Sequence, residues 1–288
     1  DASDDDTGKR LDDISWERLT VLRHPENQGV GGAMVTGYRY ALDAGADIVI
    51  KVDGDSQMDP KYMIDLIKPL TKEVCDYTKG NRFLHFDALS RMPVSRKIGN
   101  VLLTFLTKAS SGYWHVFDPQ NGYVAIRRDV LAAIDMRRIQ TSRYFFENEM
   151  LVQLNILTAR VLDCPMPAIY LADSPSSLRI IDVMQYYPGL LIRGFFYRLF
   201  YRYLLRDFSI IVPFYLIGSM MCLWGGLFGG YNWWYHATQA HQATPTGTIM
   251  LAVLPFLLGF QLLLAGLVID IFQSPRADAS PVPKNDAS

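Results

Sequence analysis

The sequence predicts an α/β domain with a mostly parallel sheet, followed by an interfacial amphipathic helix and a hairpin of two transmembrane helices. Three observations support this prediction. Short β-branched runs alternate with amphipathic stretches over residues 1–180, which is the pattern of a parallel sheet covered by helices on both faces. Residues 181–208 mix aromatic side chains with arginines, and two long apolar runs follow them.

Composition narrows the class of protein. The chain has 288 residues and a formal net charge of −1, which argues against nucleic-acid binding because such proteins normally carry a strong basic excess. Its three cysteines show no CxxC spacing, so we expect reduced thiols in a cytosol-facing protein: Cys75, Cys164 and Cys222. The opening DASDDDTGK has no initiator methionine and no leading strand, so we expect the natural chain to start upstream.

Strand and helix signals alternate along the first part of the chain. Residues 17–24 end in a short apolar run, and residues 31–45 place apolar side chains at helical spacing. Residues 47–52, DIVIKV, form a β-branched run short enough for a buried parallel strand. Residues 61–70 are amphipathic again, and Pro60 suits the first turn of a helix.

The same alternation continues further along the chain. The run CDYTKG, residues 75–80, is interpreted as the end of a strand. Residues 117–131 place a turn before another strand-to-helix step, and residues 143–154 contain the start of a helix. Residues 1–180 are therefore expected to form one α/β domain.

Residues 181–208 predict an interfacial helix. Arg198, Arg202 and Arg206 recur every four residues and therefore share one helical face. Aromatic bodies with basic tips suit a helix that lies against anionic lipid headgroups. The alternative is the solvated face of a soluble helix.

Two apolar runs, residues 209–230 and 247–272, are each long enough to cross about 30 Å of hydrocarbon. Residues 231–246 between them contain no Lys or Arg, whereas basic residues precede the first run. The positive-inside rule therefore predicts a membrane-spanning hairpin whose loop at 231–246 is non-cytoplasmic, with both chain ends and the catalytic domain on the cytoplasmic side. The alternative is a buried helical pair, and residues 273–288 are expected to be disordered.

Two carboxylates directly follow the predicted strand 47–52. Asp53 and Asp55 flank Gly54, which permits a tight bend and the close approach of a ligand, and Gln57 adds a neutral oxygen. The chain emerges here at the carboxyl edge of the sheet, where open α/β sheets bind ligands. These oxygen ligands suit Mg²⁺ or Mn²⁺, so we expect a divalent cation here, with a plain turn as the alternative.

Other motifs are expected at the same edge, and together they resemble a known family. In one collinear order the chain carries DASDDDT, NQGVGGA, DGDSQMDP, GNRF, DPQNG and FENE. This ordered set resembles the inverting family 2 glycosyltransferases, in particular their polyisoprenyl-phosphate branch, which includes dolichol-phosphate mannose synthase. The resemblance implies a GT-A type, Rossmann-like catalytic domain. It also implies transfer of a sugar from a nucleotide-diphosphate sugar to a polyprenyl phosphate of the dolichyl or undecaprenyl type.

The resemblance implies a role for each matching residue. Asp53 and Asp55 correspond to the pair that binds metal and diphosphate, and Gln57 corresponds to a further metal ligand. The residues expected to bind the nucleotide sugar are Asp1, Ser3, Gly29, Gly31, Asp53, Gly54 and Asp55. Lys79 and Arg82 are expected at the acceptor phosphate. The residues expected in catalysis are Asp55, Arg82, Asp118 and one of the acids Glu147 and Glu149.

Two departures from the family pattern bear on the donor site. Many relatives carry Lys or Arg where this chain has Val30, so that phosphate contact is either absent or supplied by another residue. The family's first strand, with its P-x-Y-N-E motif, is not in the sequence, so this chain is expected to lack part of the donor site.

Two other functions remain open at this stage. The acceptor could be a sugar hydroxyl on a membrane glycolipid, in which case Glu147 or Glu149 acts as general base. The chain could also be a membrane subunit that keeps the fold without the activity. The sequence indicates membrane association and no nucleic acid, it gives no sign of an oligomer, and it does not specify the sugar, the base or the lipid length.

Overall fold

The computed structural model describes the chain except for residues 83–93, 143–144, 168–179, 241 and 278–288. The chain divides into two compact units. The α/β unit comprises Asp1–Arg198 and Pro275–Ser288, and the helical unit comprises Leu199–Ser274. Residues 278–288 of the tail that was predicted to be disordered lie outside the described part. Arg276, however, forms a β-bridge with Val161.

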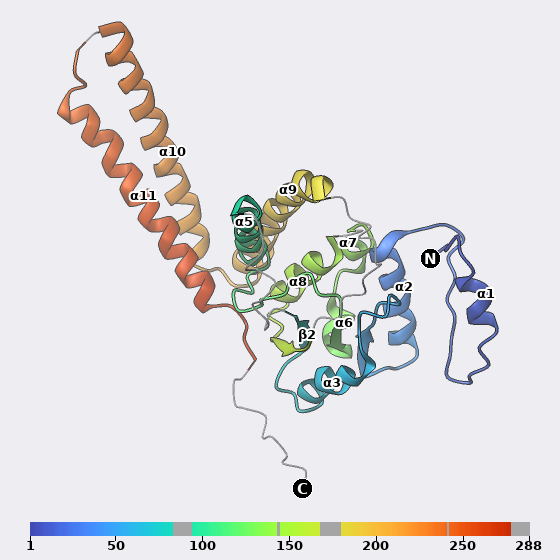
Figure 1. The fold of residues 1–288 in the computed structure, drawn as a ribbon. Coiled ribbons are helices and arrows are strands. Elements are labelled where there is room, and N and C mark those ends of the chain that lie inside the picture. The colour runs from blue at the N-terminus through green and yellow to red at the C-terminus, as the bar shows by residue number, and fades with distance from the viewer. Residues whose placement is uncertain (83–93, 143–144, 168–179, 241, 278–288) are drawn as a thin grey trace. The chain divides into compact units, whose positions relative to one another are not determined.

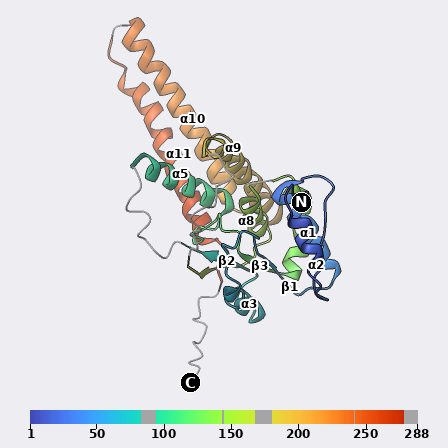
Figure 2. The same ribbon diagram turned by 45° about the vertical axis from the view of Figure 1, so that its right-hand side comes forward.

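A mixed sheet of four described strands organises the α/β unit. The strands lie in the order β1-β3-β2-β4, and Figure 2 shows β1, β3 and β2 side by side. β3 is antiparallel to β1 and β2, whereas β2 and β4 are parallel. Three described strands therefore share one direction, as predicted, but β3 separates two of them and only one neighbouring pair is parallel. The strands are β1 (Ile48–Lys51), β2 (Tyr77–Asn81), β3 (Val124–Arg127) and β4 (Val161–Pro165).

Helices cover both faces of this sheet, as the sequence predicts. Along β3, Val124 and Ile126 join a cluster with residues of α2 and α8, while Ala125 joins a second cluster with Leu66 and Leu70 of α3. This two-residue alternation places successive side chains on opposite faces. Figure 1 accordingly shows α3 and α8 on opposite sides of the sheet. The predicted α/β class is thus confirmed.

The helices of the α/β unit largely begin and end where the sequence predicts. α2 covers Gly29–Asp43, and α3 covers Met63–Thr71 after the 3₁₀ turn η1 at Pro60–Tyr62. Residues 19–24, expected at the start of the alternation, have no regular secondary structure. The other described helices are α1 (Thr7–Asp12), α5 (Val94–Ser111), α6 (Arg128–Ala133), α7 (Met136–Gln140), α8 (Phe146–Ile156) and α9 (Ile180–Arg198).

The arginines expected to form a basic lipid-facing surface are mostly buried. Arg198 is 0% exposed and donates to the carbonyl oxygens of Ala109 (2.9 Å) and Ser110 (3.0 Å) in the last turn of α5. Those carbonyls have no partner within their own helix, so Arg198 acts as a helix cap. Arg202 is also buried, and only Arg206 of the three is exposed. The predicted basic face is therefore wrong.

The exposed side chains of the same segment are mainly apolar. In α9 they include Ile192 and Phe196, and in the π-helix η3 (Leu199–Arg206) they include Phe200 and Leu205. The segment is thus amphipathic, but its apolar side chains are exposed where basic side chains were predicted. Sequence spacing identifies which residues share a face, but it does not say which face packs against the protein.

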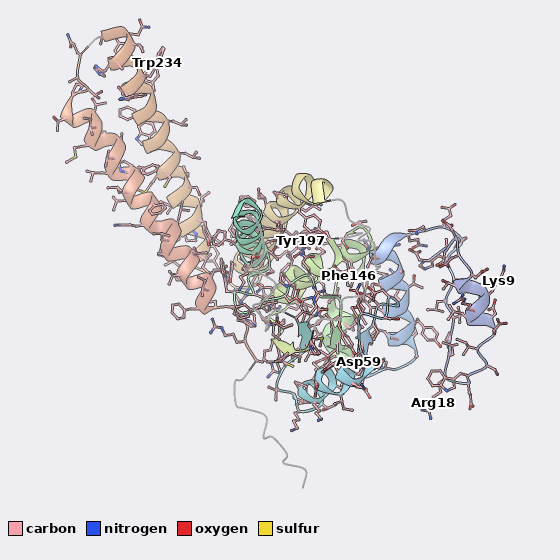
Figure 3. All side chains as sticks on the ribbon, viewed as in Figure 1. Lys9, Arg18, Asp59, Phe146, Tyr197 and Trp234 are labelled. Atoms are coloured by element: carbon pink, nitrogen blue, oxygen red, sulfur yellow. The ribbon has the colours of Figure 1, made fainter. Side chains whose placement is uncertain are left out.

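The helical unit contains two long apolar helices, α10 (Ile211–Tyr235) and α11 (Thr246–Phe272). Each is long and apolar enough to cross a membrane. In each helix, only 17% of the most apolar 18-residue stretch is buried. This exposure disfavours the alternative of a buried helical pair. The helix after α10 continues as η4 (His236–Ala240), so the predicted loop 231–246 begins too early. Figure 3 shows Trp234 close to this end of α10.

Small residues form the contact between α10 and α11. A Cβ atom at Gly225 would lie 2.5 Å from the carbonyl oxygen of Ala252, and one at Gly259 would lie 2.7 Å from the carbonyl oxygen of Gly218. Glycine and alanine let membrane helices approach closely, so that packing replaces the missing hydrophobic driving force.

Candidate active site

The acidic residues after β1 line a small cavity at the carboxyl end of that strand. Its volume is about 110 Å³. Asp53, Asp55 and Gln57 reach it from the loop after β1, Arg82 from the residue after β2, and Glu147 from the first turn of α8. The structure therefore brings together residues that are distant in the sequence.

Local backbone geometry fixes the loop that carries the two aspartates. Asp55 Oδ1 accepts a hydrogen bond from the backbone N–H of Gln57 at 3.0 Å. Between them Ser56 has a φ of +62°, a left-handed conformation that is unfavourable for a residue with a side chain. Gly54 does not have a positive φ, and a Cβ there would meet nothing within 4 Å. Ser56 therefore makes the bend, and open space lies beside Gly54.

Lys51, the last residue of β1, is a buried cation beside these carboxylates. Its Nζ lies 2.7 Å from Asp53 Oδ1 and 3.7 Å from Glu147 Oε1, and it donates to the carbonyl oxygen of Gly122 at 3.3 Å. Position 122 has no room for a side chain, because a Cβ there would lie 2.6 Å from Asp53 Oδ2. The sequence analysis missed Lys51, although a lysine in the run DIVIKV is a visible signal.

Arg82 is held in place by Asp118. Its Nε donates to Asp118 Oδ2 at 2.8 Å and its Nη2 donates to Asp118 Oδ1 at 3.1 Å, a bidentate geometry that fixes the guanidinium plane. Asp118 is buried and does not line the cavity. Asp118 thus positions Arg82 and does not itself face the cavity.

Lys79, expected to meet the acceptor phosphate with Arg82, lies beneath the cavity. It is fully buried, and its Nζ donates to the carbonyl oxygen of Asn121. Burial lowers the pKa of Lys79 to about 8. Lys79 therefore supports the turn at residues 118–122 and does not line either of the two cavities at this edge.

The two acids of α8 point in different directions. Glu147 lines the cavity, whereas Glu149 accepts from Arg138 Nε (2.6 Å) and Nη2 (3.2 Å). The Arg138 guanidinium lies 3.6 Å from the centre of the Tyr197 ring, which Figure 3 labels. Residues two apart on a helix face nearly opposite sides, so Glu149 is separated from the acidic site.

Asp163 is a second residue that the sequence analysis missed. It lies on β4 and accepts from the backbone N–H of Phe117 at 2.8 Å and from Asn81 Nδ2 at 3.2 Å. Burial raises the pKa of Asp163 to about 6. It tethers the chain before the turn at residues 118–122, and no local motif marks it.

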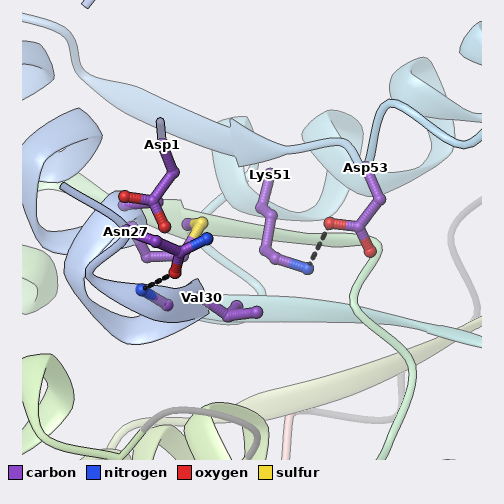
Figure 4. Close-up of a pocket in the computed structure, with 8 residues that line it drawn as sticks. Asp1, Asn27, Val30, Lys51 and Asp53 are labelled. Carbon is purple, nitrogen blue, oxygen red and sulfur yellow. Dashed lines mark hydrogen bonds and ion pairs between the residues drawn. The ribbon is translucent and has the colours of Figure 1, made fainter. Parts of the chain in front are cut away.

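A larger cavity, with a volume of about 440 Å³, adjoins the carboxylate of Asp53. Figure 4 shows this carboxylate among the residues that line the cavity. Asp1, Gly29, Val30, Lys51 and Asp53 are among the residues that line it. It opens at the N-terminus of α2, whose dipole favours an anion, and the Gly29 N–H there donates to Asn27 Oδ1 at 2.9 Å. The cavity thus combines a helix N-terminus with the loop after β1, as expected for a donor site.

Two residues expected at the nucleotide sugar lie elsewhere. Ser3 is exposed and lines neither cavity. Gly31 is buried, and a Cβ there would clash with the backbone carbonyl of Ile139. Gly31 therefore serves the packing of α2 against α7. Asp1 accepts from the backbone N–H of Gln28 at 2.9 Å, which ties it to the cavity wall.

The donor atoms at the smaller cavity fit a hard divalent cation. Asp53, Asp55 and Gln57 supply carboxylate and amide oxygens, which Mg²⁺ and Mn²⁺ prefer. In the part of the chain that the structure describes, no group of three or more His, Cys, Asp or Glu side chains could hold a metal. A cation here would therefore depend on ligand oxygens as well, as is usual for Mg²⁺ with phosphates.

The fold and the site define an α/β domain with an acidic cavity at the carboxyl end of β1. Residues 1–135 match the family model described as Glycosyl transferase family 2. This match covers a little under half of the chain, and it agrees with the family that its motifs resemble.

Curated relatives agree with this family. A UDP-N-acetylglucosamine–dolichyl-phosphate N-acetylglucosaminyltransferase of Methanococcus voltae is 30% identical over 53% of this chain and 60% of its own length. An undecaprenyl-phosphate mannosyltransferase of Micrococcus luteus is 29% identical over 58% of this chain and 68% of its own length. A polyprenol monophosphomannose synthase of Mycolicibacterium smegmatis is 25% identical over 52% of this chain and 57% of its own length. The chain thus spans about three fifths of the length of these relatives.

Proposed function

We propose that this protein transfers a sugar, with inversion, from a nucleotide-diphosphate sugar to a polyprenyl phosphate at the cytoplasmic side of a membrane. The observation that carries the proposal is the cavity shared by Asp53, Asp55, Arg82 and Glu147 at the carboxyl end of β1. An acidic pair and a fixed guanidinium on one cavity suit a reaction between two phosphorylated substrates. The names of the relatives support the same substrate classes.

The donor would occupy the larger cavity, with its diphosphate directed toward Asp53. Asp53, Asp55 and Gln57 would hold Mg²⁺ or Mn²⁺, and a bound cation would neutralise charge on the departing diphosphate. The N-terminus of α2 at Gly29 would add backbone dipoles on the same side. These groups stabilise negative charge where it develops, which is the main way in which such a site lowers a barrier.

Arg82 would bind and orient the acceptor phosphate. Its bidentate contact with Asp118 keeps the guanidinium in one orientation, so little conformational entropy is lost when an acceptor binds. A phosphate oxygen is already anionic at neutral pH and can attack without a strong general base. Glu147 would then act mainly through its charge.

A second candidate function is transfer to a hydroxyl of a membrane glycolipid. The position of Glu147 on the cavity favours it, because a hydroxyl acceptor needs a general base within reach. Glu149 does not compete for this role, since Arg138 pairs with it.

The membrane part of the proposal depends on α10 and α11. Their exposed apolar surfaces suit a membrane-embedded hairpin. Arginines before α10 and the lack of Lys or Arg between the helices favour cytoplasmic chain ends. The α/β unit, which includes the N-terminal chain end, would then lie in the cytoplasm.

The proposal is tested by forming lipid-linked sugar from full-length protein, Mg²⁺, polyprenyl phosphate and a panel of nucleotide sugars, with detection by mass spectrometry. We expect product from one donor and a loss of at least about a thousandfold with Asp55→Asn. Asp43→Asn, an exposed acid on α2, is the control and should keep full activity. No product from any donor would favour an inactive subunit.

The acceptor class is tested in the same assay with Glu147→Gln. A phosphate acceptor predicts a loss of about tenfold or less, whereas a hydroxyl acceptor predicts a loss of about a hundredfold or more.

A further inference from the structure

Lys51 joins the two cavities at the edge of the sheet. Its side chain is 4% exposed, and it lines the larger cavity together with Asp53, as Figure 4 shows. Its partners Asp53 and Glu147 also line the smaller cavity. The ammonium group is therefore buried, yet it lies at the wall of the space proposed for the donor.

A buried lysine at this position is not explained by the packing of β1. The preceding residues Ile48, Val49 and Ile50 pack into the clusters on the two faces of the sheet, and an apolar residue at position 51 would continue that pattern. Burying an ammonium group is costly unless it is paired. Asp53 and Glu147 provide the pairing, but an apolar residue would avoid the cost altogether.

The charged side chains of the larger cavity indicate a role for Lys51 in binding an anion. Among the described residues that line this cavity, Lys51 is the only basic one, while Val30 beside it is apolar. Figure 4 shows Val30 and Lys51 at the same cavity. A diphosphate in this space meets Asp1 and Asp53 as like charges, so it needs a compensating positive group.

We infer that Lys51 is a binding residue for the diphosphate of the nucleotide-sugar donor, an inference that rests on the proposed function. In the free protein Asp53 holds the ammonium group at 2.7 Å. When the diphosphate occupies the larger cavity, Lys51 donates to its oxygens from the opposite side to the N-terminus of α2. Lys51 acts by binding and takes no part in proton transfer.

The test measures binding to full-length protein in detergent with Mg²⁺, using UDP and GDP and the uncharged nucleosides uridine and guanosine. With Lys51→Gln we expect affinity for the diphosphate that binds the natural protein to fall about ten- to a hundredfold. Affinity for the matching nucleoside should stay within about twofold. Lys61→Gln, which removes a lysine that is 87% exposed, should change neither affinity.

A second substitution asks whether the charge itself is what matters. Val30→Lys, introduced together with Lys51→Gln, returns a positive charge to the same cavity. We expect it to recover at least about fivefold in diphosphate affinity, since recovery needs only a cation within reach of the phosphates. If Lys51→Gln destabilises the protein, the charge-balanced pair Lys51→Gln and Glu147→Gln gives the same comparison of diphosphate with nucleoside.

The inference is overturned if Lys51→Gln leaves diphosphate affinity unchanged. It is also overturned if diphosphate and nucleoside affinity fall equally, because that result indicates a collapsed cavity and a merely structural lysine. A natural protein that binds neither diphosphate contradicts the proposed function instead, and it is recognised before any variant is compared.

Discussion

The α/β unit and the helical unit distribute polar and apolar side chains in opposite ways. In the α/β unit, apolar residues fill two clusters on the faces of the sheet, and the buried charges Lys51 and Asp118 pair with residues distant in the sequence, Glu147 and Arg82. In the helical unit, large apolar residues of α10 and α11 are exposed, while glycines occupy the helix contact. The buried Asp270 of α11 accepts from the Tyr203 hydroxyl at 2.6 Å.

This difference teaches that each unit is built for a different solvent. In water, burial of apolar area drives folding and leaves polar groups free to form a site. In hydrocarbon that driving force is absent, and close backbone contact holds helices together. The same kind of change should therefore have different consequences in the two units, and three substitutions sharpen the comparison.

The largest effect is expected where a buried carboxylate that pairs with an arginine loses its charge. Asp118→Asn leaves Arg82 without its bidentate acceptor, so the free energy of unfolding should fall by roughly 2–4 kcal/mol, at the lower side of the range for a broken buried pair because Arg82 is partly exposed. Urea titration followed by tryptophan fluorescence measures this change. Asp129→Asn breaks the exposed pair with Arg127 (3.2 Å) and should cost less than about 1 kcal/mol. Equal costs would contradict the account.

The next effect lies in the helix contact of the hairpin. Gly225→Leu places side-chain atoms against the backbone of α11, because even a Cβ would lie 2.5 Å from the Ala252 carbonyl oxygen. We expect a loss of about 1–3 kcal/mol, measured as unfolding of the full chain over a series of SDS mole fractions. At the neighbouring Gly226 a Cβ would meet nothing within 4 Å, so Gly226→Leu should change little. If the two variants behave alike, this helix contact does not exist.

The smallest effect is a pH dependence that belongs to the α/β unit alone. Burial lowers the pKa of Lys79 to about 8, whereas the unfolded chain keeps its ordinary value of 10.5. Between these values the unfolded state binds more protons, so stability rises with pH, by at most about 1.4 kcal/mol per pH unit. Comparison of the natural protein with Lys79→Met from pH 8 to 9.5 isolates this slope. If both proteins show the same slope, burial does not lower the pKa of Lys79.

The sequence predicts local features of this protein well. The strand at 48–51, the helix at 29–43 and the acidic loop at 53–57 each depend on neighbouring residues, so pattern and spacing were sufficient. Placement of β3 between β1 and β2 depends on pairing over more than 70 positions, which no local pattern encodes. The role of Asp163 was missed for the same reason, because its partners Phe117 and Asn81 lie on other segments, whereas Lys51 was visible as a polar residue in an apolar strand.

One choice that the sequence left open and one wrong expectation have related causes. Glu147 and Glu149 share one motif, yet the helix turns them to different sides, so only the first lines the cavity. Arg198, Arg202 and Arg206 were expected on one lipid-facing surface, but the first two are buried and only Arg206 is exposed. Arg198 instead donates to carbonyl oxygens at the end of α5, which have no partner within their own helix.

The central claim is that Asp53 and Asp55 hold a divalent cation which in turn binds the donor diphosphate. The most direct test measures the affinity of full-length protein in lipid nanodiscs for UDP and GDP, with Mg²⁺, with Mn²⁺ and with EDTA. The account predicts that a cation tightens binding of one diphosphate at least about tenfold and that Asp55→Asn removes this gain. Equal affinity in EDTA, or a gain that survives in Asp55→Asn, would contradict it.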